Sequence, residues 1–326
     1  MKKTVYVLAT GGTISGAGAP GQAALYSTGA LSAADLLRGM PALPDGLAVI
    51  GEQFCDLSSE DLTEAHWIGL ARRINALAEE PDVCGFVITH GTNTMEETAF
   101  FLNLTVKTEK PVVLTGSMRP ATSLSADGPM NLYQSLCLAA SPEAAGLGVL
   151  VCFSDAVYDA RNVRKINACR PQAFSSGDLG CVGFMRDHRP FIRFRPATVH
   201  TVGSRFSADR LTELPCVDVV HVYAGADPDV FVQSSSKCSG VVLSGAGSGC
   251  VPGSWKAAIK GCVRAGKPVV RSSRTNGGVV VWDDFDDACG TLPGYDLTAE
   301  KLRILLALCI AEKLEKEELH RVLRTY

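Results

Sequence analysis

The sequence predicts an α/β protein with a larger N-terminal domain built on a parallel sheet and a smaller C-terminal α/β domain. Three observations indicate this fold. Short apolar runs alternate with helical patterns through the first half of the chain, a stretch rich in Arg, Pro and Phe interrupts them, and the alternation then resumes. Alternation at this spacing is typical of βαβ units, whose strands are parallel. The length of 326 residues is sufficient for two domains with substantial cores.

In the first half, each predicted strand is an apolar run followed by a turn and a helical pattern. The expected strands cover residues 4–8, 47–51, 85–89, 112–115 and 148–153, and the expected helices cover 32–39, 59–80, 95–105 and 128–140. The helix at 59–80 has the clearest start. Ser58 or Ser59 can cap it, and Glu60 and Asp61 place negative charge in its first turn.

The alternation breaks between about residues 186 and 214, which we interpret as an irregular or hairpin segment between the domains. We therefore expect an N-terminal domain over residues 1–188, a linker over 189–213 and a C-terminal domain over 214–326. In the C-terminal domain the expected strands are 217–223, 240–243, 268–272 and 278–282, and the expected helices are 253–265 and 298–314.

The composition, with 46% hydrophobic and 20% charged residues, is typical of a globular protein. A net charge of −3 gives no reason to expect nucleic acid or an anionic membrane as a partner. No apolar run approaches the length of a membrane span. The apolar run that follows Lys2 and Lys3 is too short for the core of a signal peptide, so we expect a cytoplasmic protein.

The twelve cysteines lie in separate, mostly apolar segments, and none form a Cys-x-x-Cys motif. Free cysteines of this kind behave as small buried apolar residues, which is consistent with a reducing compartment. The six histidines show no metal-ligand spacing. We therefore expect neither a metal nor a cofactor.

Hydroxyl-rich turns follow two of the predicted strands. Thr10-Gly11-Gly12-Thr13 follows the strand at 4–8, and Thr89-His90-Gly91-Thr92-Asn93-Thr94 leaves the strand at 85–89. Because ligands bind at the carboxyl edge of open α/β sheets, these turns can bring two threonines to one pocket. The pattern favours nucleophilic chemistry by threonine over a Ser/His/Asp triad.

Each of these residues also has a structural interpretation when it is taken alone. Thr13 lies in what can be an ordinary tight turn, and Tyr26 can be a packing residue as well as a group that helps to deprotonate Thr13. The serines at 58 and 59 can simply cap a helix, although a helix start also favours a substrate carboxylate. Lys165 can be a solvated surface lysine or, if it is buried against hydroxyls, a base.

Taken together, the motifs resemble the bacterial-type L-asparaginase family from residue 7 to the C-terminus. The most specific segments are Ala9-Thr10-Gly11-Gly12-Thr13-Ile14, residues 89–98, Ser117-Met118-Arg119-Pro120 with Ser125-Ala126-Asp127-Gly128-Pro129, and Val270-Arg271-Ser272-Ser273-Arg274. The resemblance implies a homotetramer built as a dimer of dimers. It also implies active sites that lie between the N-terminal domain of one subunit and the C-terminal domain of its partner.

The resemblance assigns a role to each candidate residue. It implies that Thr13 is the nucleophile, that Tyr26 is its hydroxyl partner on a flexible lid, and that Thr92 and Lys165 form a second pair that polarises the reacting centre. Substrate-binding roles are implied for Gly12, Ser58, Ser59, Glu60, Gly91, Thr92, Asn93, Ser117, Ser248 and Asp284. The implied reaction converts L-asparagine to L-aspartate and ammonia through an acyl-enzyme.

The chain departs from the family pattern at Asn93, where the family has an aspartate that binds the substrate α-ammonium. A neutral amide loses a charge-assisted hydrogen bond of roughly 1.5–3 kcal/mol, so we expect strongly reduced activity. Because the rest of the site is intact, we interpret Asn93 as an engineered change that traps ligand. Ser248 stands where exported members commonly have asparagine, and the partner's acidic residue aligns with Asp283 or Asp284.

Three alternative functions remain open. The chain can be a broader glutaminase-asparaginase, since both departures affect only the amino end of the substrate. If Asn93 is natural, the chain can instead be a catalytically silent amino-acid-binding protein. An amidotransferase subunit that acts on charged tRNA shares the core fold but usually carries an additional N-terminal segment.

Overall fold

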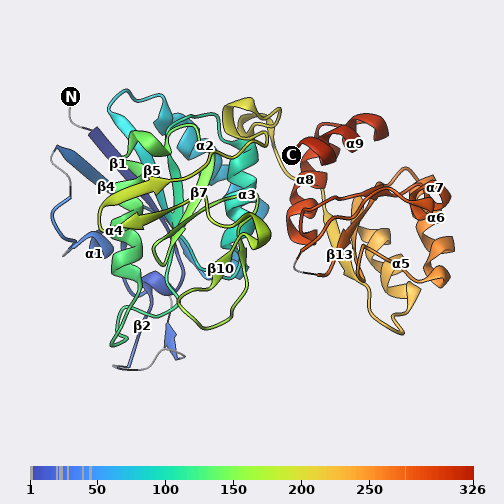
Figure 1. The fold of residues 1–326 in the computed structure, drawn as a ribbon, viewed down its shortest axis with the longest axis horizontal. Helices are drawn as coiled ribbons and strands as arrows, with labels where there is room; N and C mark the ends of the chain where they lie inside the picture. The colour runs from blue at the N-terminus through green and yellow to red at the C-terminus, as the bar shows by residue number, and fades with distance from the viewer. Residues whose placement is uncertain are drawn as a thin grey trace. The chain divides into compact units, whose positions relative to one another are not determined.

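The structure is a computed structural model that describes residues 3–19, 21, 25–27, 29–38, 40–43, 46–275 and 277–326. The chain divides into two compact units, Met1–Arg210 and Leu211–Tyr326, and each contains a β-sheet with packed helices (Figure 1). The predicted fold class, a larger parallel-sheet domain followed by a smaller α/β domain, is therefore confirmed.

The first unit is built on an eight-stranded sheet with the order β12-β11-β8-β7-β6-β5-β1-β4. Strands β4, β1, β5, β6 and β7 are parallel, while β8, β11 and β12 extend the sheet in antiparallel pairs. The bounds are β1 (Lys3–Gly11), β4 (Leu47–Leu57), β5 (Val83–Thr89), β6 (Val112–Thr115), β7 (Val149–Phe153), β8 (Ala156–Asp159), β11 (Gly183–Arg186) and β12 (Arg189–Ile192).

Helices pack against this sheet through continuous apolar stripes. Val7, Val87 and Val113 share one buried cluster with Leu132 and Leu136 of α4 (Gly128–Ala139). Helix α1 (Ala33–Leu37) contacts the same sheet at β4 and β1, and α2 (Glu64–Ala78) and α3 (Met95–Thr105) pack on each other and on β5 and β7. Because strand side chains alternate between the two faces and helices cover both, the central strands β5, β6 and β7 are mostly buried and mostly apolar, as is typical of parallel sheets.

Two short hairpins stand at the edge of the first unit and carry polar side chains. Strand β2 (Ala17–Gly18) pairs with β3 (Tyr26–Ser27), and β9 (Arg164–Lys165) pairs with β10 (Phe174–Ser175). The segment 16–29, whose composition resembles a lid, includes residues 20, 22–24 and 28, which lie outside the described residues.

Two predictions in the first unit need correction or comment. The helix expected at 59–80 begins only at Glu64, and its cap is Thr63, which forms a capping box with His66; Ser58 makes no side-chain cap. Residues 59–61 form a separate 3-10 helix. The end of the helix expected at 32–39, Gly39, lies outside the described residues.

The second unit has a parallel four-stranded sheet with the order β13-β14-β15-β16. Its strands are β13 (Val217–His221), β14 (Gly240–Gly245), β15 (Val269–Ser273) and β16 (Leu292–Pro293). Its helices are α5 (Pro228–Lys237), α6 (Lys256–Arg264), α7 (Asp284–Cys289), α8 (Ala299–Ala311) and α9 (Lys316–Thr325). Trp255 is fully buried in its core beside Phe231 and Leu243.

The strand expected at 278–282 is wrong. Among the described residues of this segment, Val280 alone forms a β-bridge, with Tyr295, and the place beside β15 is taken by β16. The segment 189–213, which was expected to be a linker, includes β12 of the first sheet. Its remaining regular elements are short 3-10 helices at Thr201–Gly203 and Ala208–Arg210.

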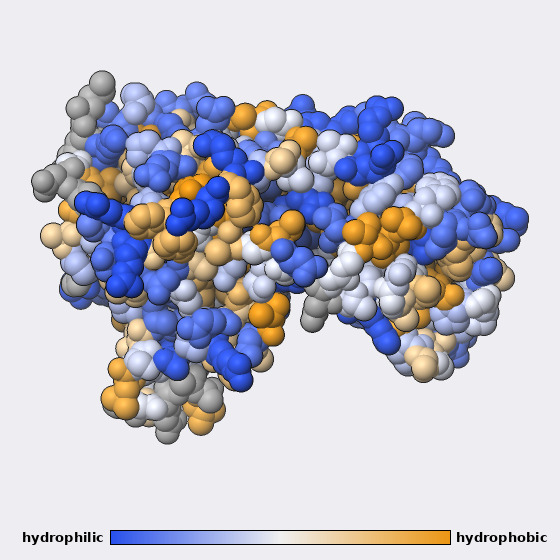
Figure 2. All heavy atoms as spheres, in the orientation of Figure 1, coloured by the Kyte–Doolittle hydropathy of each residue, from blue (hydrophilic) through white to orange (hydrophobic). Residues whose placement is uncertain are grey.

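The surface view in Figure 2 shows hydrophilic residues with small hydrophobic patches between them. Within the described part of the chain, no helix has both the length and the apolar character that a bilayer crossing requires.

Candidate active site

The two hydroxyl-rich turns predicted from the sequence meet at one edge of the first sheet. Strands β1 and β5 are parallel neighbours, and the Thr10 hydroxyl donates to the Thr89 carbonyl at 2.9 Å. Gly12 has a φ of 82°, and a Cβ atom there would lie 2.4 Å from the backbone nitrogen of Gly91. A side chain at residue 12 would therefore separate the turns, so glycine is required for their close approach.

The turns border a small cavity of about 110 Å³, lined mainly by polar groups. Thr13 and Thr92, which come from different turns, both face it. The lining consists of Gly12, Thr13, Tyr26, Ser58, Ser59, Glu60, Gly91, Thr92, Asn93, Met118, Lys165 and Ala168. Ten of the thirteen candidate residues thus share one cavity, whose volume fits a small polar ligand.

The Thr13 hydroxyl lies 2.6 Å from the Tyr26 hydroxyl, and either oxygen can be the donor. Thr13 itself is nearly buried, with 9% of its surface exposed. The β2–β3 hairpin brings Tyr26 back over Thr13, thirteen residues earlier in the chain. A short contact between two hydroxyl-bearing residues that both line the cavity provides a route for moving a proton away from Thr13.

A lysine lies beside the second threonine. Lys165 Nζ donates to Thr92 Oγ1 at 2.9 Å and to Asn93 Oδ1 at 2.7 Å. The Lys165 backbone nitrogen also donates to the Glu96 carboxylate, which fixes this end of β9 against α3. Burial lowers the pKa of the Lys165 ammonium, while the nearby Glu60 and Glu96 carboxylates oppose that shift. A lowered pKa increases the fraction of the lysine that is unprotonated at neutral pH, which is the form that can act as a base.

The Ser59–Asp61 helix supplies the cavity's acidic group. Ser59 is buried against Gly91, where an added Cβ atom would lie 2.8 Å from the Ser59 side chain. The pKa of the exposed Glu60 carboxyl is lowered, first by a hydrogen bond from its own backbone N–H. Burial raises the pKa of Glu60, while hydrogen bonds from the Asn93 amide and the Ser59 hydroxyl and the charge of Lys165 lower it. Glu60 is therefore ionised at neutral pH.

Three candidate residues lie elsewhere. Ser117 is fully buried and lines an adjacent, more apolar cavity, and its hydroxyl has no hydrogen-bond partner among the described residues. Ser248 and Asp284 are exposed residues of the second unit. Sequence reasoning did not select Met118, Ala168 or Glu96. Met118 follows Ser117 and Ala168 lies three residues after Lys165, so proximity in the sequence to selected residues could have indicated both.

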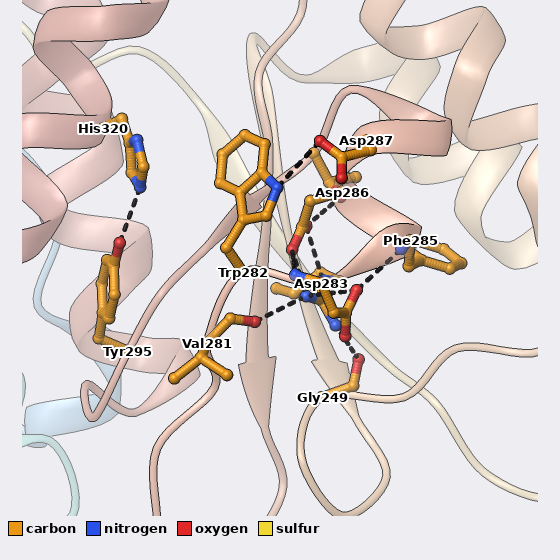
Figure 3. Close-up of polar contacts among 11 residues, drawn as sticks. Gly249, Val281, Trp282, Asp283, Phe285, Asp286, Asp287, Tyr295 and His320 are labelled. Carbon is orange, nitrogen blue, oxygen red and sulfur yellow. Dashed lines mark hydrogen bonds and ion pairs between the residues drawn. The ribbon is translucent and has the colours of Figure 1, made fainter.

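In the second unit, the segments that carry Ser248 and Asp284 both contact Arg271 of β15, through Gly249 and Asp283. Figure 3 labels Gly249, Asp283 and Asp286 of this cluster. Arg271 donates to the Gly249 carbonyl at 3.4 Å, to the Val281 carbonyl at 3.1 Å and to the Asp286 carboxylate at 2.8 Å, and it pairs with Asp283 at 3.2 Å. Thr291 donates to the same Asp286 carboxylate at 2.5 Å. This buried cluster fixes both segments to the sheet.

Two family models cover most of the chain. "Asparaginase, N-terminal" matches residues 4–197, and "Glutaminase/Asparaginase C-terminal domain" matches residues 216–323. The chain belongs to the asparaginase family. The family resemblance predicted from the motifs is therefore confirmed.

Individual members of the asparaginase family align with almost the whole of this chain. L-asparaginase 2 of Escherichia coli (strain K12) is 38% identical over 325 residues, which cover 99% of this chain and 93% of the relative. The glutaminase-asparaginase of Acinetobacter glutaminasificans is 37% identical over 333 residues, with both chains fully covered. A crystal structure of a probable cytoplasmic L-asparaginase from Campylobacter jejuni superimposes with a TM-score of 0.96 at 36% identity and covers both chains fully.

Throughout the described part of this asparaginase, no cluster of three or more His, Cys, Asp or Glu residues has an arrangement that could hold a metal ion. The cysteines are free thiols. The described lining of the cavity offers hydroxyl, amide, carboxylate and ammonium groups for chemistry.

Proposed function

We propose that this chain hydrolyses L-asparagine to L-aspartate and ammonia, with Thr13 as the nucleophile. The observation that carries the proposal is the contact of 2.6 Å between the Thr13 and Tyr26 hydroxyls at the wall of a polar cavity. Membership of the asparaginase family and the names of the full-length relatives support the substrate. No cofactor enters the proposed reaction.

In the first half-reaction, Thr13 Oγ1 bonds to the carbon of the substrate's side-chain amide. The hydroxyl proton passes through Tyr26 to the amide nitrogen, the carbon–nitrogen bond breaks, and ammonia leaves. In the second half-reaction, water attacks the ester, aspartate leaves, and Thr13 regains its proton. Thr92, held by Lys165, polarises the reacting centre from the other side of the cavity.

Thr13→Ala tests this assignment. We expect it to reduce ammonia release by at least about 10³-fold, because no other group replaces the nucleophile. Thr92→Val is the matched control, since it also removes one cavity hydroxyl but leaves the Thr13–Tyr26 pair. Mass spectrometry after an acid quench should find an aspartyl adduct on the Thr13 peptide of the parent and of Thr92→Val. An adduct on the Thr92 peptide instead would contradict the choice of nucleophile.

We propose that the chain prefers asparagine over glutamine, whose side chain is one methylene longer; one methylene in a binding pocket is worth roughly 1–3 kcal/mol of discrimination. Parallel assays of both substrates measure this preference, and equal kcat/KM values would support a broader glutaminase-asparaginase, the name that several relatives carry. We also propose that Asn93 lowers the activity, because residue 93 contributes no charge to substrate binding.

We further propose a cytoplasmic homotetramer, a dimer of dimers, in which Ser248 and Asp284 of the partner subunit complete each cavity. The family resemblance supports the tetramer, and the neighbour that is titled a probable cytoplasmic L-asparaginase from Campylobacter jejuni supports the compartment. Sedimentation of the full chain at a monomer or dimer mass would exclude the tetramer.

A further inference from the structure

A second cavity, the apolar cavity, lies beside the polar one in the first unit and has a volume of about 190 Å³. Its apolar lining includes Ile14, Leu31, Leu36, Met40 and Leu132. No described residue lines both cavities. They are neighbours in the chain, however, because Ile14 and Ser117 of the apolar cavity adjoin Thr13 and Met118 of the polar one.

One buried hydroxyl in this lining is left without a partner. Ser117 is fully buried, and its Oγ makes no hydrogen bond with the described residues. A buried polar group without a partner is costly, so a molecule that bonds to it gains binding free energy. Rotation about one side-chain torsion can turn the Ser117 hydroxyl towards the cavity, where it can both donate and accept.

The charged side chains of the lining are already occupied with one another or with nearby groups. Asp35 pairs with Arg38 at 3.0 Å, and Arg119 donates to the Ser125 hydroxyl at 2.6 Å. These contacts leave no unpaired charge among the described lining residues to select a charged ligand. A charge placed next to Ser117 would lose its hydration in exchange for one hydroxyl, which is strongly unfavourable. The chemistry of the lining therefore selects a neutral ligand.

The volume limits the size of that ligand. An apolar cavity of about 150 Å³ can hold one benzene ring, so 190 Å³ has room for a single ring with one small substituent. We propose that the apolar cavity binds a small neutral molecule that has an apolar ring and one hydroxyl group, and that this hydroxyl bonds to Ser117. Phenol is the simplest such molecule. The proposal goes beyond the hydrolysis of asparagine and does not depend on it.

Calorimetric titration of the full chain with phenol, toluene and benzoate tests this site. Phenol should bind with a dissociation constant on the order of 1 mM or below. Benzoate has a similar ring but carries a charge, so it should bind at least about 10-fold more weakly than phenol. Benzoate binding as tight as phenol binding would show that the cavity selects an acid through its arginines, and it would overturn the proposal.

The role of Ser117 is tested by a cycle of two ligands and two proteins. Ser117→Ala should weaken phenol binding about 3- to 10-fold, the usual size of one hydrogen bond. Toluene has a methyl group in place of the hydroxyl, so the same substitution should leave its affinity unchanged or raise it. An equal loss for both ligands would mean that the hydroxyl of phenol does not bond to Ser117.

Two matched controls locate the ligand. Ser135→Ala removes an equally buried hydroxyl that donates to the Asn131 carbonyl and lies outside the cavity lining, so phenol affinity should stay within about 2-fold of the parent. Thr92→Val removes a hydroxyl from the polar cavity and should also have less than about a 2-fold effect. A loss with Thr92→Val but not with Ser117→Ala would place phenol in the polar cavity and refute the proposal.

A cavity-filling variant tests the site independently of its hydroxyl. A Cβ atom at Gly128 would lie 3.0 Å from Ile14 Cγ1 and 3.3 Å from Ser117 Cβ. Gly128→Ala should therefore weaken phenol and toluene alike, by at least about 10-fold, with circular dichroism to confirm that the variant is folded. If it does not fold, the Ser117→Ala cycle decides. Absence of saturable phenol binding by the folded parent up to about 10 mM would overturn the proposal outright.

Discussion

Each unit contains a basic side chain close to carboxylates, but the charges border a cavity in the first unit and are buried against each other in the second. In the first unit, Lys165 and Glu60 are bridged by Asn93 and border a cavity. In the second unit, Arg271 contacts Asp286 directly, and their side chains are 2% and 0% exposed. The first arrangement leaves charge available to a ligand. In the second arrangement, the buried Arg271 and Asp286 side chains pair with each other.

Replacement of the buried cation should have the largest effect on stability. Arg271→Met leaves the Asp286 carboxylate buried with only its hydrogen bonds from Thr291 and the Asp283 backbone. An uncompensated buried charge costs about 3–5 kcal/mol. We expect that loss in the free energy of unfolding, measured by urea titration. Hydrogen exchange should increase mainly in peptides of the second unit, while the matching change Lys165→Met should leave exchange in that unit unaffected.

The double variant Arg271→Met/Asp286→Leu is the control for this interpretation. It removes both charges and fills the site with apolar groups, so it should recover part of the lost stability. A double variant that is less stable than Arg271→Met would show that Asp286 stabilises the fold by itself, and the comparison between the two clusters would then not hold.

The sequence correctly predicted elements in which most residues are buried. Strand β6 (Val112–Thr115) and helix α3 (Met95–Thr105) match their predicted ranges residue for residue, and most of their residues are buried. Strands β8, β11 and β12 were missed, since they alternate buried and more exposed residues and form only when they pair with the existing sheet. The segment 278–282 has strand-like residues, but the strand next to β15 comes from Leu292 and Pro293.

For the candidate site, the sequence could predict which turns meet, because neighbouring parallel strands end at the same edge. It could not predict the bridge from Glu60 through Asn93 to Lys165. These residues are 33 and 72 positions apart, and their contact depends on side-chain orientations that no local pattern records. The buried Arg271 was noticed only as part of a motif, and its partner Asp286 follows fifteen residues later.

His90, a titratable residue next to the cavity-lining Gly91, should have an intermediate effect on stability. His90 is fully buried next to Gly91, and burial lowers its pKa to about 4, although its hydrogen bond with the Gly91 carbonyl opposes the shift. The unfolded chain has an ordinary histidine pKa near 6.5, so it binds more protons than the folded chain between about pH 6.5 and 4. The stability that neutral His90 contributes is therefore complete above pH 6.5 and is lost as the pH falls through that range.

We expect roughly 2–3 kcal/mol of unfolding free energy to be lost between pH 7 and pH 4.5 on account of His90. His90→Asn keeps an amide N–H for the Gly91 carbonyl but does not titrate, so its stability should depend less on pH by that amount. Urea titrations of both proteins at the two pH values measure the difference. Identical pH dependence in the parent and the variant would mean that His90 does not carry this effect.

The smallest effect is expected at an exposed ion pair that has the same chemistry as the buried one. Arg73 of α2 donates to both carboxylate oxygens of Glu52 on β4, at 2.8–3.2 Å, but the two side chains are 42% and 31% exposed. Water and salt screen such a pair, so its interaction free energy should be about 0.2–1 kcal/mol. A double-mutant cycle with Arg73→Met and Glu52→Gln measures it in urea titrations.

The two arginine–carboxylate pairs should also differ in how their contribution to stability depends on salt. Raising the ionic strength to about 1 M shortens the screening length to roughly 3 Å, which should remove most of the Arg73–Glu52 interaction. The cost of Arg271→Met should persist at the same salt concentration, because the Arg271 and Asp286 side chains are buried. If salt reduced the contribution of both pairs to stability by the same amount, burial would not explain why the two contributions differ. The Arg271 cluster would then have to be open to solvent. Constant coupling at the exposed pair would instead mean that its fixed geometry, with three hydrogen bonds joining α2 to β4, outweighs screening.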